Sequence, residues 1–294
     1  MQVFTELNEN KSIVLILGFF DGIHLGHQKV IESAVEYAKQ NNLKSAVLTF
    51  SKHPMCVINN LEPKYIMQNR KSIVERLGVD YFYEVNFNLN IAAMEPEEYL
   101  SSIIIKNFEP KAIFTGFNHT FGVDRKGNPN LLKNFQDKFG YKYFEIPPQM
   151  FNDEVISSTK IRTALSSGDI IQANSMLGRD FEISGVVIEG QRLGRKLGYK
   201  TANIEYPKNL VNIPFGVYEV VTDFGSGIAN FGLRPTVNNT NTPVLEVHIL
   251  NFDKDIYNKL LSVKFVKMIR PERKFNSIEE LKNQIKMDIK TITS

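Results

Sequence analysis

Short apolar runs alternate with longer segments of helical periodicity from residue 11 to about residue 178. The apolar runs predict β-strands at 12–18, 44–50, 81–87, 111–117 and 142–146. The other segments predict helices at 27–41, 70–77, 96–107, 130–139 and 158–177. Because helical crossovers join strands of the same direction, this order predicts an α/β domain with a parallel sheet.

The pattern changes after Asp180 to closely spaced strands that are separated by Gly, Pro and Asn. Strands are predicted at 182–189, 215–224, 228–233, 244–250 and 262–269, and a final helix begins near residue 277. This spacing is typical of a small antiparallel β-barrel that is closed by one helix. The sequence therefore predicts two domains, 1–180 and 181–294.

Composition narrows the class of protein without naming a function. Of the 294 residues, 43% are hydrophobic and 23% charged, as in soluble globular proteins. The longest apolar stretch, 13–20, is too short to span a membrane, and the N-terminus lacks the features of a secretory signal. We therefore expect a cytoplasmic protein that does not contact membranes.

Charge and cysteine content exclude several further classes. The formal net charge is +3, but the basic residues are scattered, so nucleic-acid binding is not predicted. The single cysteine, Cys56, excludes an internal disulfide bond and a Cys-rich zinc cluster. Anionic small molecules remain the expected partners, and the oligomeric state is not predicted.

The segment GFFDGIHLGH, from Gly18 to His27, joins the first long strand to the first long helix. Gly18, Gly22 and Gly26 allow close approach of a phosphate, and the helix N-terminus that follows favours negative charge. His24 and His27 are three residues apart, so both imidazoles can donate to phosphate oxygens. The alternative is a common Gly-rich turn with two structural histidines.

Two motifs of the first half resemble those of the nucleotidyltransferase superfamily. Residues 24–27 match its HxGH signature, and Phe20 and Asp21 extend the match. Residues 156–162, ISSTKIR, resemble its ISSTxxR motif, in which Ser158 or Thr159 caps a helix and Arg162 binds phosphate. An ordinary capped helix with exposed Lys160 and Arg162 is the alternative for this second motif.

These residues suit transfer of an adenylyl group without a covalent intermediate. An incoming phosphate oxygen would attack the α-phosphorus of ATP, and pyrophosphate would leave in line. We expect His24, His27 and Arg162 to neutralise and position the phosphates, with Mg²⁺ bridging them.

The second half carries glycines four residues apart, at Gly190, Gly194 and Gly198. No GxxxxGK[ST] motif is present, so a kinase here would use another design. Thr201 and Asn203 offer the hard oxygen ligands that Mg²⁺ prefers. A Gly-rich hairpin connection is the alternative interpretation.

The order of the motifs resembles that of the bacterial bifunctional riboflavin kinase and FAD synthetase family over nearly the whole chain. The motifs are GFFDGIHLGH, SKHP, GFNHTFG, SSTKIR, GRKLGYKTANI, FGVYEV, LRPTV, LEVHIL and IRPERKF. The resemblance implies a nucleotidyltransferase-type, Rossmann-like first domain and a flavokinase barrel. It also implies that ATP and Mg²⁺ convert riboflavin to FMN and then FMN to FAD.

The resemblance also implies roles for individual residues. Glu246 would be the catalytic base of the kinase, and Thr201 and Asn203 would bind the metal. Ligand binding is implied for His53, Pro54, Asn118, Gly190, Gly194, Arg195, Gly198 and Arg270. Strand alternation is consistent with the first role, because it places Glu246 and His248 on one face and apolar residues on the other.

Two positions depart from the family pattern. Lys200 precedes Thr201 where the family usually has proline, and His119 stands where the family usually has phenylalanine. A lysine does not fix φ as proline does, so the barrel could instead be a non-catalytic flavin-binding or regulatory module. The first half could also transfer a nucleotidyl group to another acceptor.

Overall fold

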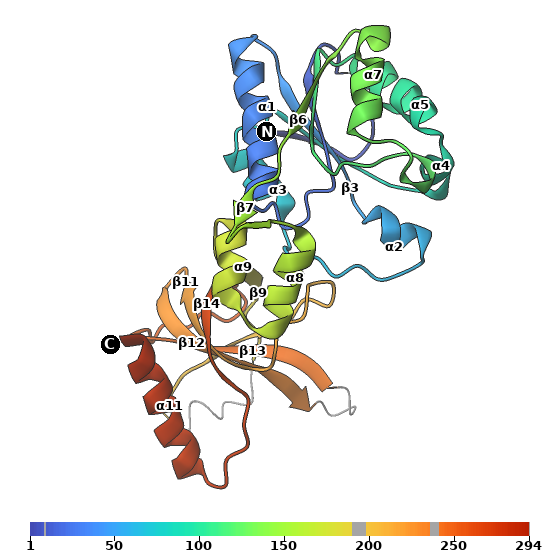
Figure 1. The fold of residues 1–294 in the computed structure, drawn as a ribbon. Coiled ribbons are helices and arrows are strands. Elements are labelled where there is room, and N and C mark those ends of the chain that lie inside the picture. The colour runs from blue at the N-terminus through green and yellow to red at the C-terminus, as the bar shows by residue number, and fades with distance from the viewer. Residues whose placement is uncertain (9, 190–197, 236–240, 294) are drawn as a thin grey trace. The chain divides into compact units, whose positions relative to one another are not determined.

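The computed structural model describes residues 1–294 except 9, 190–197, 236–240 and 294, and the side chains of 234, 235, 241 and 242 (Figure 1). The chain forms two compact units. Unit 1 contains residues 1–63 and 69–157, and unit 2 contains residues 64–68 and 158–294. Across the described residues, no helix combines the length and apolar character that a membrane crossing needs.

Unit 1 is built on a six-stranded parallel sheet in the order β1-β4-β3-β2-β5-β6. Its strands are β1 (Gln2–Phe4), β2 (Val14–Leu17), β3 (Ser45–Phe50), β4 (Tyr81–Val85), β5 (Ala112–Gly116) and β6 (Lys142–Ile146). A short hairpin follows, β7 (Met150–Phe151) with β8 (Glu154–Val155). The predicted parallel sheet is confirmed, and β1 adds an edge strand that the apolar pattern did not predict.

From β2 to β6, helices connect the successive strands of unit 1, as crossovers between parallel strands require. They are α1 (Leu25–Gln40), α2 (Pro54–Ile58), α3 (Arg70–Arg76), α4 (Leu89–Ala93), α5 (Pro96–Tyr99), α6 (Lys106–Phe108) and α7 (Pro129–Phe139). A π-helical segment, η1 (Leu100–Ile105), joins α5 to α6, and a 3₁₀ turn, η2 (Val123–Arg125), precedes α7. Residues 96–107 are therefore helical throughout, as predicted, but the helix changes from α to π at Leu100 and back to α at Lys106.

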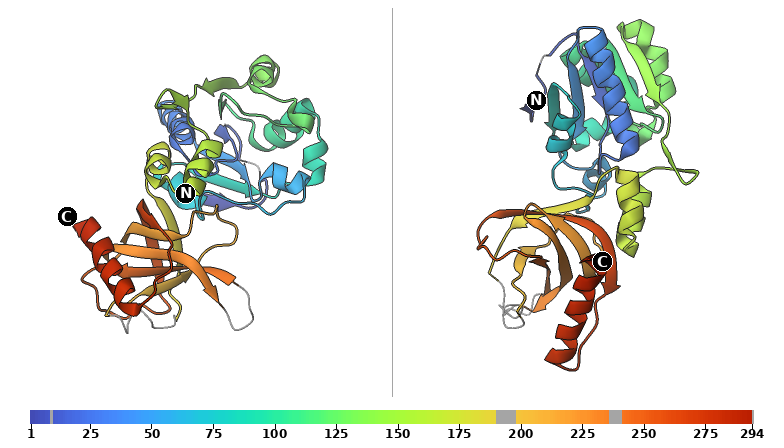
Figure 2. Two further views of the ribbon diagram at one scale, coloured as in Figure 1. Left: turned by 60° about the horizontal axis from the view of Figure 1, so that its bottom comes forward. Right: turned by 90° about the vertical axis from the view of Figure 1, so that its left-hand side faces the viewer.

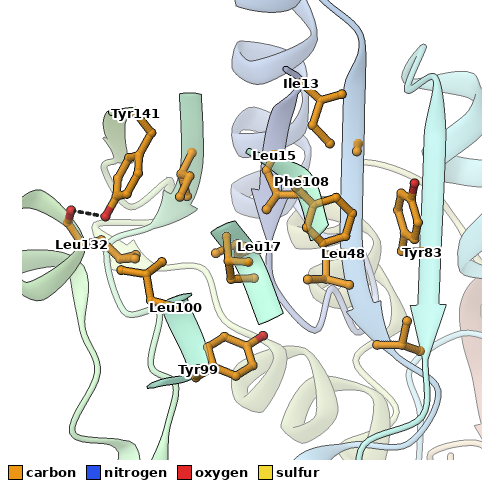
Figure 3. Close-up of a cluster of buried hydrophobic side chains, with 14 residues drawn as sticks. Ile13, Leu15, Leu17, Leu48, Tyr83, Tyr99, Leu100, Phe108, Leu132 and Tyr141 are labelled. Atoms are coloured by element: carbon orange, nitrogen blue, oxygen red, sulfur yellow. Dashed lines mark hydrogen bonds between the residues drawn. The ribbon is translucent and has the colours of Figure 1, made fainter. Parts of the chain in front are cut away.

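The two faces of the sheet are buried by different helices. On one face Leu15 and Leu17 join a buried cluster with Leu48, Leu100 and Phe108 (Figure 3). Val14 and Ile16, which are also buried, point to the other face, where α1 packs. Each such side chain contributes about 1.5 to 3 kcal/mol by leaving water, so the central strand is fixed from both sides.

Unit 2 contains an antiparallel sheet in the order β10-β13-β12-β11-β14-β9, which curls into a barrel (Figure 2). Its strands are β9 (Phe181–Val186), β10 (Ala202–Glu205), β11 (Gly216–Thr222), β12 (Gly225–Pro235), β13 (Asn241–Ile249) and β14 (Leu260–Pro271). A bridge between Ile188 and Asn203 links the two ends of the sheet. The predicted barrel is confirmed and is nearly closed.

Unit 2 also holds α8 (Ser158–Ser167), α9 (Ile170–Leu177), α11 (Ile278–Thr293) and the segment Lys64–Gln68. The sequence pattern predicted one helix over 158–177, and that prediction was wrong. Gly168 has φ +85° and ends α8, and the Asp169 side chain accepts from the backbone N–H of Gln172 to begin α9.

Candidate active sites

The turn between β2 and α1 brings the first predicted site residues together. A Cβ atom on Gly18 would lie 2.6 Å from the Phe20 ring, so the turn requires glycine there. Phe20 and Asp21 are 3% and 4% exposed, Gly22 has φ +79°, and Gly26 lies in the first turn of α1. The turn is thus a packed structure rather than an open loop.

His24 and His27 lie side by side at the N-terminus of α1. His24 caps the helix, because its Nδ1 accepts from the backbone N–H of His27 at 3.3 Å. The two rings are stacked with centroids 3.7 Å apart and an interplanar angle of 17°. The Phe20 ring meets His27 edge-on at 5.3 Å. Two imidazoles therefore share one location where the helix N-terminus favours an anion.

The SKHP segment, residues 51–54, contacts the turn between β2 and α1. His53 caps α2 by accepting from the backbone N–H of Met55 at 3.2 Å, and Pro54 is the first residue of that helix. The His53 ring packs edge-on against Phe19 at 4.5 Å. The structure thus brings together two motifs that are about 30 residues apart in the sequence.

Asn118 lies just beyond the carboxyl end of β5, the strand that pairs with β2, and its side chain is exposed. The neighbouring His119 is half-buried, and its ring is nearly parallel to that of Phe121, with centroids 5.8 Å apart. Burial lowers the pKa of His119 to about 4. Its Nε2 is buried and has no hydrogen-bond partner in the part of the chain that the structure describes.

Of the SSTKIR residues, Ser157 is the last residue of unit 1, and residues 158–162 belong to unit 2. Ser158 and Thr159 form the first turn of α8, and Arg162 donates from Nε and Nη2 to the carbonyl of Lys64 at 3.3 Å. The predicted cap and phosphate-binding roles of these residues stay predictions.

Strand pairing in the barrel places two of the predicted kinase residues directly opposite each other. Asn203 on β10 pairs with Glu246 on β13. Leu245, Val247 and Ile249 are buried, whereas Glu246 and His248 are half-buried, so the alternation matches the expectation from sequence. Cross-strand partners have Cβ atoms about 5 Å apart, which is close enough for both side chains to serve one ligand.

Asn203 fits the metal-binding role that the family implies. Its side chain is 3% exposed, and Oδ1 has no hydrogen-bond partner among the described residues. Its Nδ2 donates to the carbonyl of Thr201 at 3.5 Å. A buried carbonyl oxygen without a donor costs about 1 to 3 kcal/mol, and a hard cation would satisfy it.

A pocket in unit 2 opens beside Thr201. Its wall combines apolar side chains with charged groups, including Val187, Val247, Phe252, Asp253, Tyr257 and Lys200. Such a mixture is typical of small-molecule sites, where apolar and aromatic groups hold a flat ring and a few polar groups fix its orientation. No sequence motif had marked the segment 252–257 that forms part of this wall.

Contacts around Lys200 fix the backbone ahead of Thr201. The Lys200 Nζ forms an ion pair with Asp253. The His248 ring donates from Nδ1 to the carbonyl of Lys200 at 2.8 Å, since a carbonyl can only accept. The Tyr199 ring packs edge-on against His248 at 5.2 Å. Side-chain contacts therefore constrain the position where the family usually has proline.

The remaining predicted ligand residues have different settings. Gly190, Gly194 and Arg195 lie outside the described residues. Gly198 has φ +89°, and among the described residues no atom lies within 4 Å of the position that a Cβ would take. Arg270 on β14 donates to both carboxylate oxygens of Asp288, from Nε at 3.1 Å and from Nη2 at 2.9 Å, and thereby anchors α11. Its predicted contact with a ligand stays a prediction.

Two family models match this chain. The FAD synthetase model matches residues 6–160, and the riboflavin kinase model matches residues 177–294. A crystal structure described as a macrolide-efflux protein from Streptococcus pneumoniae superimposes with a TM-score of 0.88 at 30% identity, covering 98% of this chain and 97% of that one. The efflux description belongs to that protein; the superposition supports the fold described above.

Curated relatives with the same name match along almost their entire length. The bifunctional riboflavin kinase/FMN adenylyltransferase of Bacillus subtilis is 36% identical over 95% of this chain and 91% of its own. Those of Buchnera aphidicola from Schizaphis graminum and of Escherichia coli K12 are 35% and 33% identical, over 98% and 94% of this chain. The chain belongs to the bifunctional riboflavin kinase/FMN adenylyltransferase family.

Proposed function

We propose that this protein phosphorylates riboflavin to FMN with ATP and then adenylylates FMN to FAD with release of pyrophosphate. Residues 1–180 would carry the second reaction and residues 181–294 the first. The observation that carries the proposal is the pairing of buried Asn203 with Glu246. It supports a working kinase in the half of the chain where Lys200 departs from the family pattern.

In the kinase reaction, Glu246 would accept the proton of the riboflavin hydroxyl as that oxygen attacks the γ-phosphorus of ATP, and the bond from the γ-phosphorus to the β,γ-bridging oxygen would break to release ADP. Asn203 Oδ1 and the Thr201 hydroxyl would hold Mg²⁺, which when bound would neutralise phosphate charge. The pocket beside Thr201 would hold the base of the nucleotide between Val187, Val247 and Phe252.

In the adenylyl transfer, a phosphate oxygen of FMN would attack the α-phosphorus of ATP. His24 and His27 would donate to the phosphate oxygens, and the backbone of the Gly18–Gly22 turn would approach them closely. Ser158, Thr159 and Arg162 keep their predicted role as phosphate ligands. His53, Pro54 and Asn118 keep their predicted place near the flavin or nucleotide. No covalent intermediate is needed.

The test is a two-step assay on the full-length protein. Purified protein is supplied with riboflavin and MgATP, or with FMN and MgATP, and the flavins are separated by chromatography. We expect FMN and FAD from the first mixture and FAD from the second. FAD from FMN but no product from riboflavin would instead assign a non-catalytic, flavin-binding or regulatory role to the barrel.

A further inference from the structure

Arg70, the first residue of α3, donates hydrogen bonds to residues at the carboxyl ends of three strands of unit 1, namely β2, β3 and β4. Its Nη1 donates to the carbonyl of Phe19 at 2.8 Å and to Oγ1 of Thr49 at 3.3 Å. Its Nη2 donates to the carbonyl of Phe50 at 2.8 Å and to Oε1 of Glu84 at 2.6 Å. The Arg70 side chain is 11% exposed, so these bonds are largely shielded from water.

The loop that Arg70 holds has an unfavourable backbone conformation. Phe20 has φ +56° and Ile23 has φ +37°, although both carry bulky side chains. Such conformations cost about 1 to 3 kcal/mol each and persist only where the surroundings hold them. At the start of this loop, the Phe19 carbonyl accepts from Arg70 and, at 3.0 Å, from Thr49 Oγ1. A loop under such strain depends on these anchors.

Arg70 also connects this loop to the SKHP segment. Its guanidinium lies over the Phe19 ring, 4.7 Å from the centroid, and the same ring packs edge-on against His53. A single side chain thus fixes both the carbonyl and the ring of Phe19. Phe19 lies five residues before His24.

We infer that Arg70 is a positioning residue for adenylyl transfer, which keeps the strained loop, and through it His24 and His27, in the geometry that the reaction needs. The inference rests on the proposed function. Arginine suits this role because its planar fork donates to several oxygens at once. A lysine could keep the ion pair with Glu84. Its single ammonium group could not also donate to the three other oxygens that Arg70 reaches, the carbonyls of Phe19 and Phe50 and Oγ1 of Thr49.

The test compares wild-type protein with Arg70→Lys in the full-length chain. We expect kcat for FAD formation from FMN to fall about 10- to 100-fold, because small displacements of catalytic groups have effects of this size. The KM for FMN should stay within about twofold, and riboflavin phosphorylation by the same sample should be unchanged. Phosphorylation at the wild-type rate shows that unit 2 is folded, and a KM for FMN near the wild-type value shows that unit 1, which contains Arg70, is folded.

The matched control is Asp80→Asn at the opposite ends of the same strands. Asp80 accepts from Lys44 Nζ at 2.6 Å, and from the backbone N–H and Oγ of Ser45 at 2.9 and 3.0 Å. This variant should lose stability without losing kcat. Equal losses of FAD formation in Asp80→Asn and Arg70→Lys would overturn the inference, as would wild-type kcat in Arg70→Lys.

Thr49→Val decides the question if Arg70→Lys does not fold. It removes one of the two donors to the Phe19 carbonyl and nearly conserves volume, so we expect a smaller loss of kcat in the same direction. Unchanged kcat in a folded Thr49→Val would overturn the inference. A wild-type protein that forms no FAD from FMN would overturn the proposed function itself, which is a distinct result.

Discussion

At the scale of single residues, we expect His119 to make the stability of the protein depend on pH. Burial lowers its pKa from the ordinary 6.5 to about 4, so the unfolded chain binds more protons between these pH values. This contribution is fully present above pH 6.5 and is lost as the pH falls toward 4. In His119→Phe, urea unfolding at pH 7 and pH 5 should show a pH effect smaller by roughly 1 to 2 kcal/mol. An unchanged effect would contradict the assignment.

His248 acts on the residue before the proposed metal ligand. Replacing His248 by Phe keeps an aromatic ring beside Tyr199 but removes the hydrogen bond to the Lys200 carbonyl. We expect riboflavin phosphorylation to fall about tenfold, because the backbone ahead of Thr201 loses an anchor. His248→Asn, whose amide N–H can replace Nδ1–H, should retain most of the activity. Equal activities in the two variants would argue against the anchoring role.

At the scale of elements, the attachment of α11 depends on one buried ion pair. Asp288 is 2% exposed and accepts from Arg270 and, at 2.7 Å, from Nε2 of Gln284. Removing one partner of a buried pair costs about 3 to 5 kcal/mol, so Asp288→Ala should lower the free energy of unfolding by that order. Urea denaturation of the full-length variant measures the loss.

Arg273→Ala is the matched control for this element. Arg273 lies 3.9 Å from Glu280 and donates to Gln284 Oε1 at 2.7 Å, but the Arg273 and Glu280 side chains are well exposed, so the loss of these contacts should cost about 1 kcal/mol or less. Similar losses in Asp288→Ala and Arg273→Ala would show that α11 is held by its apolar contacts instead.

The sequence pattern predicted elements more reliably than the contacts between them. Apolar runs are buried on both faces, so strands such as 45–50 were found almost to the residue. The break at Gly168 was missed because the apolar spacing continues across it, although Gly-Asp is a turn signal.

Cross-strand register placed Asn203 opposite Glu246, and no local pattern encodes register between segments 40 residues apart. Arg70 was missed for the same reason, because its partners lie 14 to 51 residues away.

At the scale of the whole molecule, two reactions in one chain predict two separable sets of variants. His27→Ala should reduce FAD formation from FMN and spare riboflavin phosphorylation, since His27 would donate to the phosphates in adenylyl transfer and lies outside the barrel. Glu246→Gln should do the reverse, because Glu246 lies in unit 2 and would be the catalytic base of the kinase. Loss of about 10²-fold in one activity only is the expected result for each, and chromatography of the flavins measures both. Loss of both activities in either variant would contradict separate sites.

The segment Lys64–Gln68 bears on how this protein can be divided. It lies in the middle of the unit 1 sequence but belongs to unit 2, where Tyr65 bridges Leu210 and Gln68 exchanges two hydrogen bonds with the backbone of Ser184. The chain therefore passes between the units three times. Division of the chain at any single point therefore leaves at least one unit incomplete. A riboflavin kinase truncated to residues 158–294 would lack the segment 64–68, which a grafted peptide or a circular permutation could restore.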